Sequence, residues 1–218
     1  MGERPSELES ARVARQLRDD IVLGRRRPGS RLVERDIAAQ LNVSRLPVRE
    51  AIRALVTEGI VVARPRTWAV VREYTLGDVR DFAEVRGPIE TMLFVYAAER
   101  HDEAGLEGLR RVLEREEQAA RDGDQAASRA AAGDFHAYMA VLASNDVLTE
   151  LAGVFATRLK WIFGLHQDLQ GMAASHRELF EAIEARDVEL VRRLLAEHLA
   201  AGTAAAERRF GTESTSTG

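Results

Sequence analysis

Three histidines in the C-terminal part of the chain could together bind a metal ion. His136, His176 and His198 each share a face of a helical segment with apolar side chains. A buried imidazole needs a hydrogen-bond partner or a ligand, and neutral imidazole is a common ligand for divalent cations. The three rings could therefore converge on one cation. Each could equally be a separate core histidine with its own hydrogen bond, and no local spacing links the three.

An arginine also lies on an apolar face in this part of the chain. Arg86 shares its face with Phe82, Ile89 and Leu93. A buried arginine must be paired, so it either forms a salt bridge, for example with an acidic residue of a neighbouring helix, or clamps the carboxylate of an anionic ligand. Asn145, Arg158 and His166 are further candidates for binding such a ligand.

Arginines near the N-terminus have a spacing that suits DNA recognition. Arg45, Arg49 and Arg53 recur four residues apart along a helix that Ser44 can cap and Gly59 can end. A guanidinium can pair with guanine through two hydrogen bonds in the major groove. The alternative is that the three arginines only solvate an exposed helix face.

The segments around this helix predict a helix-turn-helix with a β-hairpin wing. Asn42 is suited to the left-handed conformation that ends the preceding helix, and Ser44 follows it two residues later. Two β-branched runs around a basic turn indicate the hairpin. The expected helices cover residues 6–23, 32–41 and about 45–58, and the expected strands cover residues 60–63 and 68–71.

From Thr75 onward the pattern is helical throughout. Short polar breaks separate the segments, which is typical of an antiparallel helical bundle. The expected helices after the one that Thr75 caps cover residues 103–121, 126–143, 147–165, 172–185 and 188–209. The fold class is therefore mostly α, with a DNA-binding domain at 1–74, an effector-binding and dimerisation domain at 75–210, and a disordered tail at 211–218.

Composition sets further limits. The 218 residues include no cysteine, which excludes disulfides and thiolate metal sites, and no apolar run is long enough to span a membrane. We therefore expect a cytoplasmic protein. The net charge is −4, but residues 1–74 hold 15 arginines against 10 acidic residues, net +5, while the remainder has a net charge of −9. Only the first part could approach phosphate.

The segment PGSRLVERDIAAQLNVSRLPVREAIRALVTEGIV resembles the winged helix of the GntR family of bacterial transcription regulators. The resemblance implies that Arg35, Ser44, Arg45 and Arg49 contact operator DNA and that the wing tip, with Arg66, reaches the minor groove. Arg45 and Arg49 are the candidates for base edges. Ser44 and Arg35 are expected to hold phosphates and set the register.

Two residues depart from the family pattern in this segment. Leu46 stands where a threonine is common, which suggests an apolar contact, such as one to a thymine methyl group. Trp68 stands where the wing usually has glycine. It could stiffen the hairpin, pack on another domain or lie against the sugar-phosphate backbone.

The segments DFHAYMAVLASNDVL, SHRELFEAIEARD and LLAEHLA resemble the ligand-binding domain of the FadR-like branch of this family. The resemblance implies that His136, His176 and His198 bind zinc or nickel, and that Arg86 faces an effector cavity. Family members add an aspartate one turn before the first histidine, but this chain has Ala132 there. Asp134 lies on nearly the opposite side of the helix.

Together these features predict a dimeric transcription regulator, not an enzyme. It would act as a repressor that a small organic acid releases from a palindromic operator. One alternative is an architectural DNA-binding protein with a purely dimerising bundle. Another is a metalloenzyme with a DNA-binding appendage, although the sequence offers no general base or nucleophile pair for it.

Overall fold

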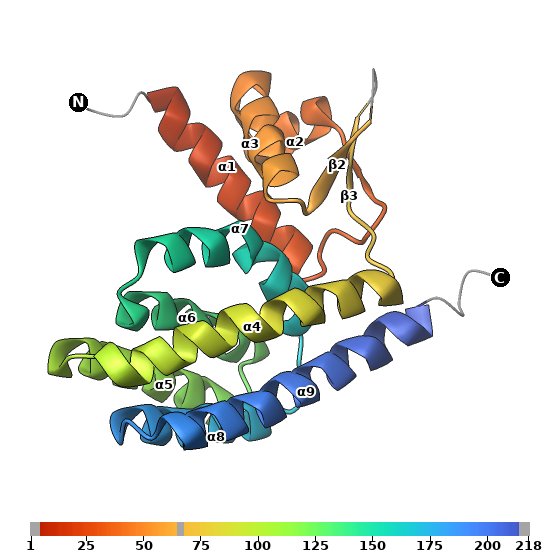
Figure 1. Ribbon diagram of the computed structural model, residues 1–218. Helices are drawn as coiled ribbons and strands as arrows, with labels where there is room; N and C mark the ends of the chain where they lie inside the picture. Colours follow the sequence, from red (N-terminus) through yellow and green to blue (C-terminus); the bar gives the residue numbers. More distant parts are fainter. Residues whose placement is uncertain (1–4, 65–67, 214–218) are drawn as a thin grey trace. The chain divides into compact units, whose positions relative to one another are not determined.

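The structure is a computed structural model that describes residues 5–64 and 68–213. Contacts divide the chain into two units, residues 1–74 and 75–218. The first is a winged helix-turn-helix and the second is a helical bundle (Figure 1), which confirms the predicted fold class.

Three helices form the core of the N-terminal unit: α1 Pro5–Val22, α2 Glu34–Leu41 and α3 Arg45–Thr57. Val13, Leu17 and Ile21 recur at four-residue spacing along α1 and are completely buried. Asn42 has φ +52° and ends α2 in the left-handed conformation. Only Val43 and Ser44 then separate Asn42 from α3, so the turn between the two helices is tight.

A three-stranded antiparallel sheet completes this unit. Its strands are β1 Arg31–Leu32, β2 Val61–Ala63 and β3 Ala69–Val71, in the order β1-β3-β2. The expected hairpin is therefore present. The expected start of the second helix at residue 32 is wrong, because Leu32 pairs with Ala69 in the sheet and α2 begins at Glu34.

Trp68 packs within its own unit. The Arg31 guanidinium lies 4.1 Å from the centre of the Trp68 ring, so the tryptophan ties the hairpin to β1. The backbone N–H of Arg64 donates to the carbonyl of Trp68 and closes the hairpin. The tip of the wing, residues 65–67 with Arg66, lies outside the described residues.

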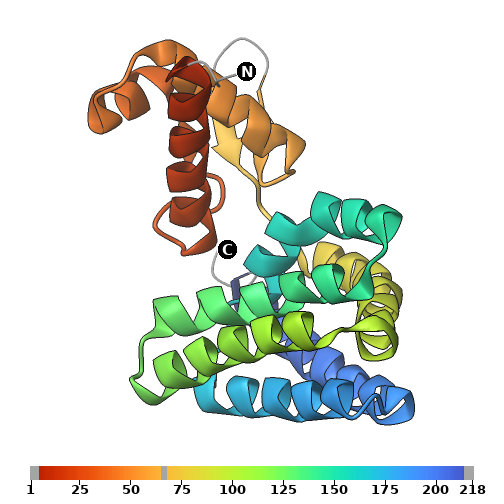
Figure 2. The ribbon, with the colours of Figure 1, turned by 90° about the vertical axis from the view of Figure 1, so that its left-hand side faces the viewer.

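The helices of the second unit pack as an antiparallel bundle, in which α4 lies along α9 and α5 along α6 (Figures 1 and 2). Phe94, Phe135 and Phe180 are completely buried in its core. The helices are α4 Leu76–Arg100, α5 Glu103–Arg121, α6 Gln125–Ala143, α7 Asp146–Phe163, α8 Leu169–Glu184 and α9 Val188–Glu213.

Polar side chains fix where these helices begin. Thr75 and Asp78 form a reciprocal capping box at α4. The side chains of Asp102, Asp124 and Asp168 accept backbone N–H bonds at the starts of α5, α6 and α8.

At the other end of the unit, α9 continues to Glu213. Residues 211–213, expected to belong to a disordered tail, are therefore helical. Residues 214–218 of that tail lie outside the described residues.

Candidate functional site

The N-terminus of α3 presents the predicted DNA-binding residues to solvent. Ser44 occupies the N-cap position, but its side chain makes no capping hydrogen bond. Its hydroxyl and the first backbone N–H groups of α3 are therefore suited to binding a phosphate. Leu46 is the second residue of α3 and is 54 % exposed, so its side chain is accessible for an apolar contact.

Glu34 holds the two arginines that are the base-edge candidates. Its carboxylate accepts two hydrogen bonds from Arg49, both 2.9 Å long, and one of 3.3 Å from Arg45. Hydrogen bonds from Arg49 lower the pKa of the Glu34 carboxyl, against burial that raises it. Such exposed ion pairs are weak, so both arginines can leave Glu34 for DNA. Arg35 is also exposed and pairs with Asp36 at 3.0 Å.

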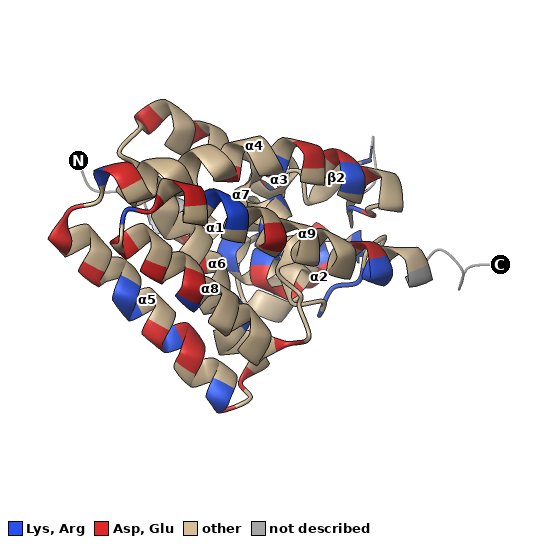
Figure 3. Ribbon diagram, turned by 60° about the horizontal axis from the view of Figure 1, so that its bottom comes forward, with Lys and Arg blue, Asp and Glu red and all other residues tan. Residues whose placement is uncertain are grey.

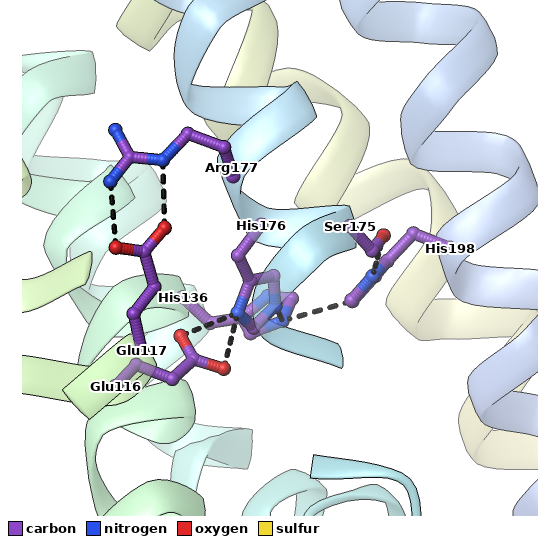
Figure 4. Close-up of polar contacts among 7 residues, drawn as sticks. All are labelled: Glu116, Glu117, His136, Ser175, His176, Arg177 and His198. Carbon is purple, nitrogen blue, oxygen red and sulfur yellow. Dashed lines mark hydrogen bonds and ion pairs between the residues drawn. The ribbon is translucent and has the colours of Figure 1, made fainter. Parts of the chain in front are cut away.

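The three candidate metal ligands meet inside the bundle. His136 on α6, His176 on α8 and His198 on α9 point their Nε2 atoms toward one another (Figure 4). The His136 Nε2 atom lies 3.3 Å from that of His176 and 3.2 Å from that of His198. Two nitrogens bound tetrahedrally to zinc at about 2.1 Å lie about 3.4 Å apart. Two of the three nitrogen pairs therefore have the spacing that a divalent cation requires, and all three ligand atoms lie within 4.8 Å of one another.

The outer nitrogens of the three rings also have polar neighbours. The Nδ1 atom of His176 lies 2.8 and 3.0 Å from the two carboxylate oxygens of Glu116, and that of His198 lies 3.0 Å from the Ser175 hydroxyl. The His136 Nδ1 atom lies 3.2 Å from Glu90, without the alignment of a hydrogen bond. Such outer contacts orient imidazole ligands toward a metal.

Burial controls the protonation of this cluster. Together with the neighbouring His136, burial lowers the pKa of His176 well below its usual value and that of His198 to about 3. Both rings are therefore neutral at pH 7, the form that binds metal. Burial also raises the pKa of Glu116 to about 8. At neutral pH one proton is therefore shared between the Glu116 carboxylate and the Nδ1 atom of His176. If a cation binds the Nε2 atom of His176, this proton must lie on Nδ1.

Within the described residues, the cluster contains no carboxylate ligand. Ala132 lies one turn before His136 and is 5 % exposed. Asp134 is exposed and lies 3.6 Å from Arg115, so it points away from the histidines. A cation held here would keep coordination positions open for water or for an oxygen of a ligand.

The histidine cluster lies in a cavity of about 300 Å³ with walls from α4, α6, α7, α8 and α9. Arg86 lines it and is 7 % exposed. Glu90 accepts hydrogen bonds of 2.9 and 3.3 Å from the Arg86 Nε and Nη2 atoms. Burial would raise the pKa of Glu90, but Arg86 and His136 more than offset this and hold it well below its usual value. The Arg86 Nη1 atom is buried and has no hydrogen-bond partner among the described residues.

Two of the predicted effector-binding residues, Asn145 and Arg158, are absent from the part of the cavity wall that the structure describes. Asn145 is the N-cap of α7, and its side chain accepts the backbone N–H of Leu148. Arg158 donates to the Val154 carbonyl and stacks against aromatic rings on α4 and α7. Of the four candidates, Arg86 and His166 therefore line the cavity that holds the histidine cluster.

Two acidic residues in the site escaped the sequence analysis. Glu116 lies three residues after Leu113 and four after Val112, on the buried face of α5, and is completely buried. Glu90 follows Arg86 by one helical turn. In both cases an acidic residue on an apolar face was the available signal, because a buried carboxylate needs a nearby partner.

Comparison with known proteins identifies both units. Residues 9–71 match the bacterial regulatory proteins of the gntR family, and residues 81–201, more than half of the chain, match the FCD domain. The chain belongs to the GntR family. In this GntR regulator the FCD match contains all three histidines and Arg86, and the other match contains α3.

Relatives cover nearly the full length. A probable D-xylose utilization operon transcriptional repressor of Paenarthrobacter nicotinovorans is 32 % identical over 87 % of this chain and 86 % of its own. The transcriptional repressor RspR of Escherichia coli is 27 % identical over 89 % and 87 %. The structure of E. coli McbR/YncC has a TM-score of 0.81 at 25 % identity and covers 93 % of this chain and 98 % of its own.

These similarities show that the GntR chain is a transcription regulator and not an enzyme, which removes the metalloenzyme alternative. The helices within the described residues include none that is long and apolar enough to cross a membrane.

Proposed function

We propose that the chain is a homodimeric repressor that a small organic acid releases from a palindromic operator. The observation that carries this proposal is the unpaired Nη1 atom of buried Arg86, which lines the same cavity as three converging histidines. A buried donor without a partner is costly unless a ligand satisfies it. A bundle that only dimerised would need neither this donor nor the cavity, which disfavours the architectural alternative.

The names of two relatives support repression as the direction of control, since both are called repressors. For DNA contact we propose Arg45 and Arg49 on base edges, Ser44 and Arg35 on phosphates, and Arg66 at the wing tip.

Zinc or nickel fits the histidine cluster. The ion would be held by the Nε2 atoms of His136, His176 and His198. Glu116 would orient the His176 ring, and Ser175 would orient the His198 ring. The ion would supply a positive charge and open positions for a carboxylate oxygen.

Helix α4 is the element that connects ligand and DNA in this proposal. It carries Arg86, and its cap Thr75 follows the winged-helix unit directly in the sequence. A ligand can change operator affinity only by binding two arrangements of the chain unequally. An acid bound to Arg86 contacts α4, which follows β3 after the short segment 72–75. Its binding would therefore favour an arrangement of the chain that does not fit the operator.

The proposed dimer contact is an apolar face of the bundle. Val147, Leu151 and Val154 recur at helical spacing on α7 and are between 48 and 68 % exposed, and α4 exposes Val85 and Met92. By contrast, α5 carries closely spaced acidic and basic residues, as a solvent-facing helix does (Figure 3). A contiguous exposed apolar surface usually marks an interface.

Charges along α7 favour a second copy of the chain as the partner. Asp146 and Glu150 lie in the N-terminal part of α7, and Arg158 lies in its C-terminal part. If two copies of α7 pack antiparallel across a two-fold axis, each acidic end faces a basic end. The same symmetry matches a palindromic operator.

Footprinting on genomic fragments retained by the full chain tests this function. We expect protection of two inverted half-sites about 34 Å apart, or a multiple of that distance. Leu151→Glu places like charges across the two-fold axis, so we expect a monomer in sedimentation and at least tenfold weaker protection of the paired site. Ala126→Glu adds the same charge at an exposed position of α6 and should leave both unchanged. A single half-site, or a Leu151→Glu variant that remains a dimer, would contradict this arrangement.

A further inference from the structure

The cavity of the FCD unit has two chemically different ends. One end holds the three Nε2 atoms, Arg86 and Glu90, and the ionisable lining residues also include His166 and Lys160. The rest of the wall comes mainly from apolar side chains of α4, α6 and α7. These include Phe82, Ile89, Ala140, Ala152, Phe155 and Leu159. A ligand that fills the space must therefore be polar at one end and apolar along the remainder.

The apolar end offers almost no hydrogen bonds to a ligand. Thr149 is its polar lining residue on the N-terminal half of α7, and its hydroxyl already donates to the Asn145 carbonyl at 2.9 Å. Lys160 lines the cavity further along α7, and its side chain lies along Gly133 of α6, near the histidine end. A ligand hydroxyl placed against this wall would lose its hydrogen bonds to water and find no replacement.

The polar end is built for one carboxylate. Glu90 uses two nitrogens of Arg86 and leaves Nη1 as the free donor, while the Phe163 ring lies 4.6 Å from the guanidinium carbon. Residue 202 is a glycine, and a Cβ there would lie 3.4 Å from Nη1, so Nη1 lies close to the backbone of α9. The donor is thus part of the cavity wall, next to histidines that leave coordination positions open.

The size of the cavity limits the ligand. A volume of about 300 Å³ is the lower end of the range for ligand pockets. Because one water takes up about 30 Å³, the space holds on the order of ten water-sized groups. A carboxylate then leaves room for a body of roughly five to eight carbon atoms.

We propose that the effector is a monocarboxylic acid with an apolar, unhydroxylated body, either branched aliphatic or aromatic. Its carboxylate lies between Arg86 and the cation of the histidine cluster, and its body lies against α4, α6 and α7. This inference rests on the proposed effector function of the cavity. We therefore expect that sugars do not bind this cavity. Each ligand hydroxyl buried without a partner lowers affinity by about tenfold or more, so a pentose or an aldonic acid would bind weakly.

The test is thermal unfolding and calorimetric titration of the full, zinc-loaded chain with single compounds. The apolar probes are phenylacetate and 4-methylpentanoate, and the polar probes are D-xylose, D-xylonate and succinate. At 100 times the dissociation constant, we expect an apolar acid to raise Tm by about 5 °C or more. The polar probes at the same concentration should leave Tm within about 1 °C of the free protein.

Two variants locate the binding. Ala152→Leu fills the apolar wall and should weaken the binding of 4-methylpentanoate at least tenfold, with the zinc content unchanged. Arg86→Gln should remove the response to both acids. Because this change leaves Glu90 buried without its partner, Arg86→Gln/Glu90→Gln serves as the matched, uncharged pair and should behave in the same way.

Two outcomes would overturn the inference. If D-xylonate or succinate binds as tightly as the apolar acids, the effector is a polar acid, and release by an organic acid still stands. If neither apolar acid binds, the inference also fails, while footprinting decides separately whether the chain is an operator-binding dimer.

Discussion

Replacing Arg49 with alanine is expected to weaken operator binding by about 30-fold or more. A bidentate contact from arginine to guanine contributes about 1–3 kcal/mol, and a dimer makes it twice, so the loss is about 2–6 kcal/mol. Arg49 is exposed and its partner Glu34 is on the surface, so the variant should fold normally. Fluorescence anisotropy with the footprinted operator, at fixed salt, measures the effect.

Arg53→Ala provides the matched control for this variant. Arg53 lies one turn further along α3 and is also exposed. Its loss should change affinity only a few-fold and equally for all DNA sequences, as loss of a phosphate contact does. A dissociation constant for Arg49→Ala within twofold of the wild type would show that α3 does not read bases through Arg49.

A second large effect is expected for metal content. The purified chain should hold about one zinc or nickel ion by elemental analysis, and His176→Ala and His198→Ala should hold none, because two imidazoles remain. Both variants are measured because His176→Ala also leaves buried Glu116 without its partner, whereas His198→Ala does not. Glu116→Gln should retain the ligands but lose about 10- to 100-fold in metal affinity.

His166→Ala is the control for these variants. This histidine also lines the cavity and is buried, but it lies outside the three-histidine cluster. It should keep its metal. Equal metal content in all variants, or none in the wild type after incubation with both metals, would remove the ion from the account and leave Arg86 as the anchor of the ligand.

Local chemistry explains why much of the fold could be predicted. Thr75 with Asp78, Asn42 and Gly59 each determine the backbone within a few residues, so the elements that they begin or end are evident in the sequence. Strand β1 is different. It is two residues long and exists because Leu32 pairs with Ala69, a contact that no local pattern encodes.

The same distinction applies to the site. Three histidines on apolar faces indicated buried imidazoles, but their convergence depends on how α6, α8 and α9 pack. The contacts of Glu116 with His176 and of Arg31 with Trp68 also join distant segments. Asn145 was expected to bind a ligand, but its side chain accepts the backbone N–H of Leu148 at the start of α7. A local contact of this kind could have been predicted from the position of Asn145 before a helix.

The most direct test of ligand-controlled DNA release is the dissociation constant of the zinc-loaded full chain from its operator, measured with and without saturating 4-methylpentanoate. Coupling free energies of 1–3 kcal/mol are common between linked sites, so we expect the acid to weaken operator binding by about tenfold. It should have no effect on His176→Ala. An unchanged dissociation constant, under conditions in which the acid raises Tm, would contradict the account, because the cavity would then bind a ligand without controlling DNA.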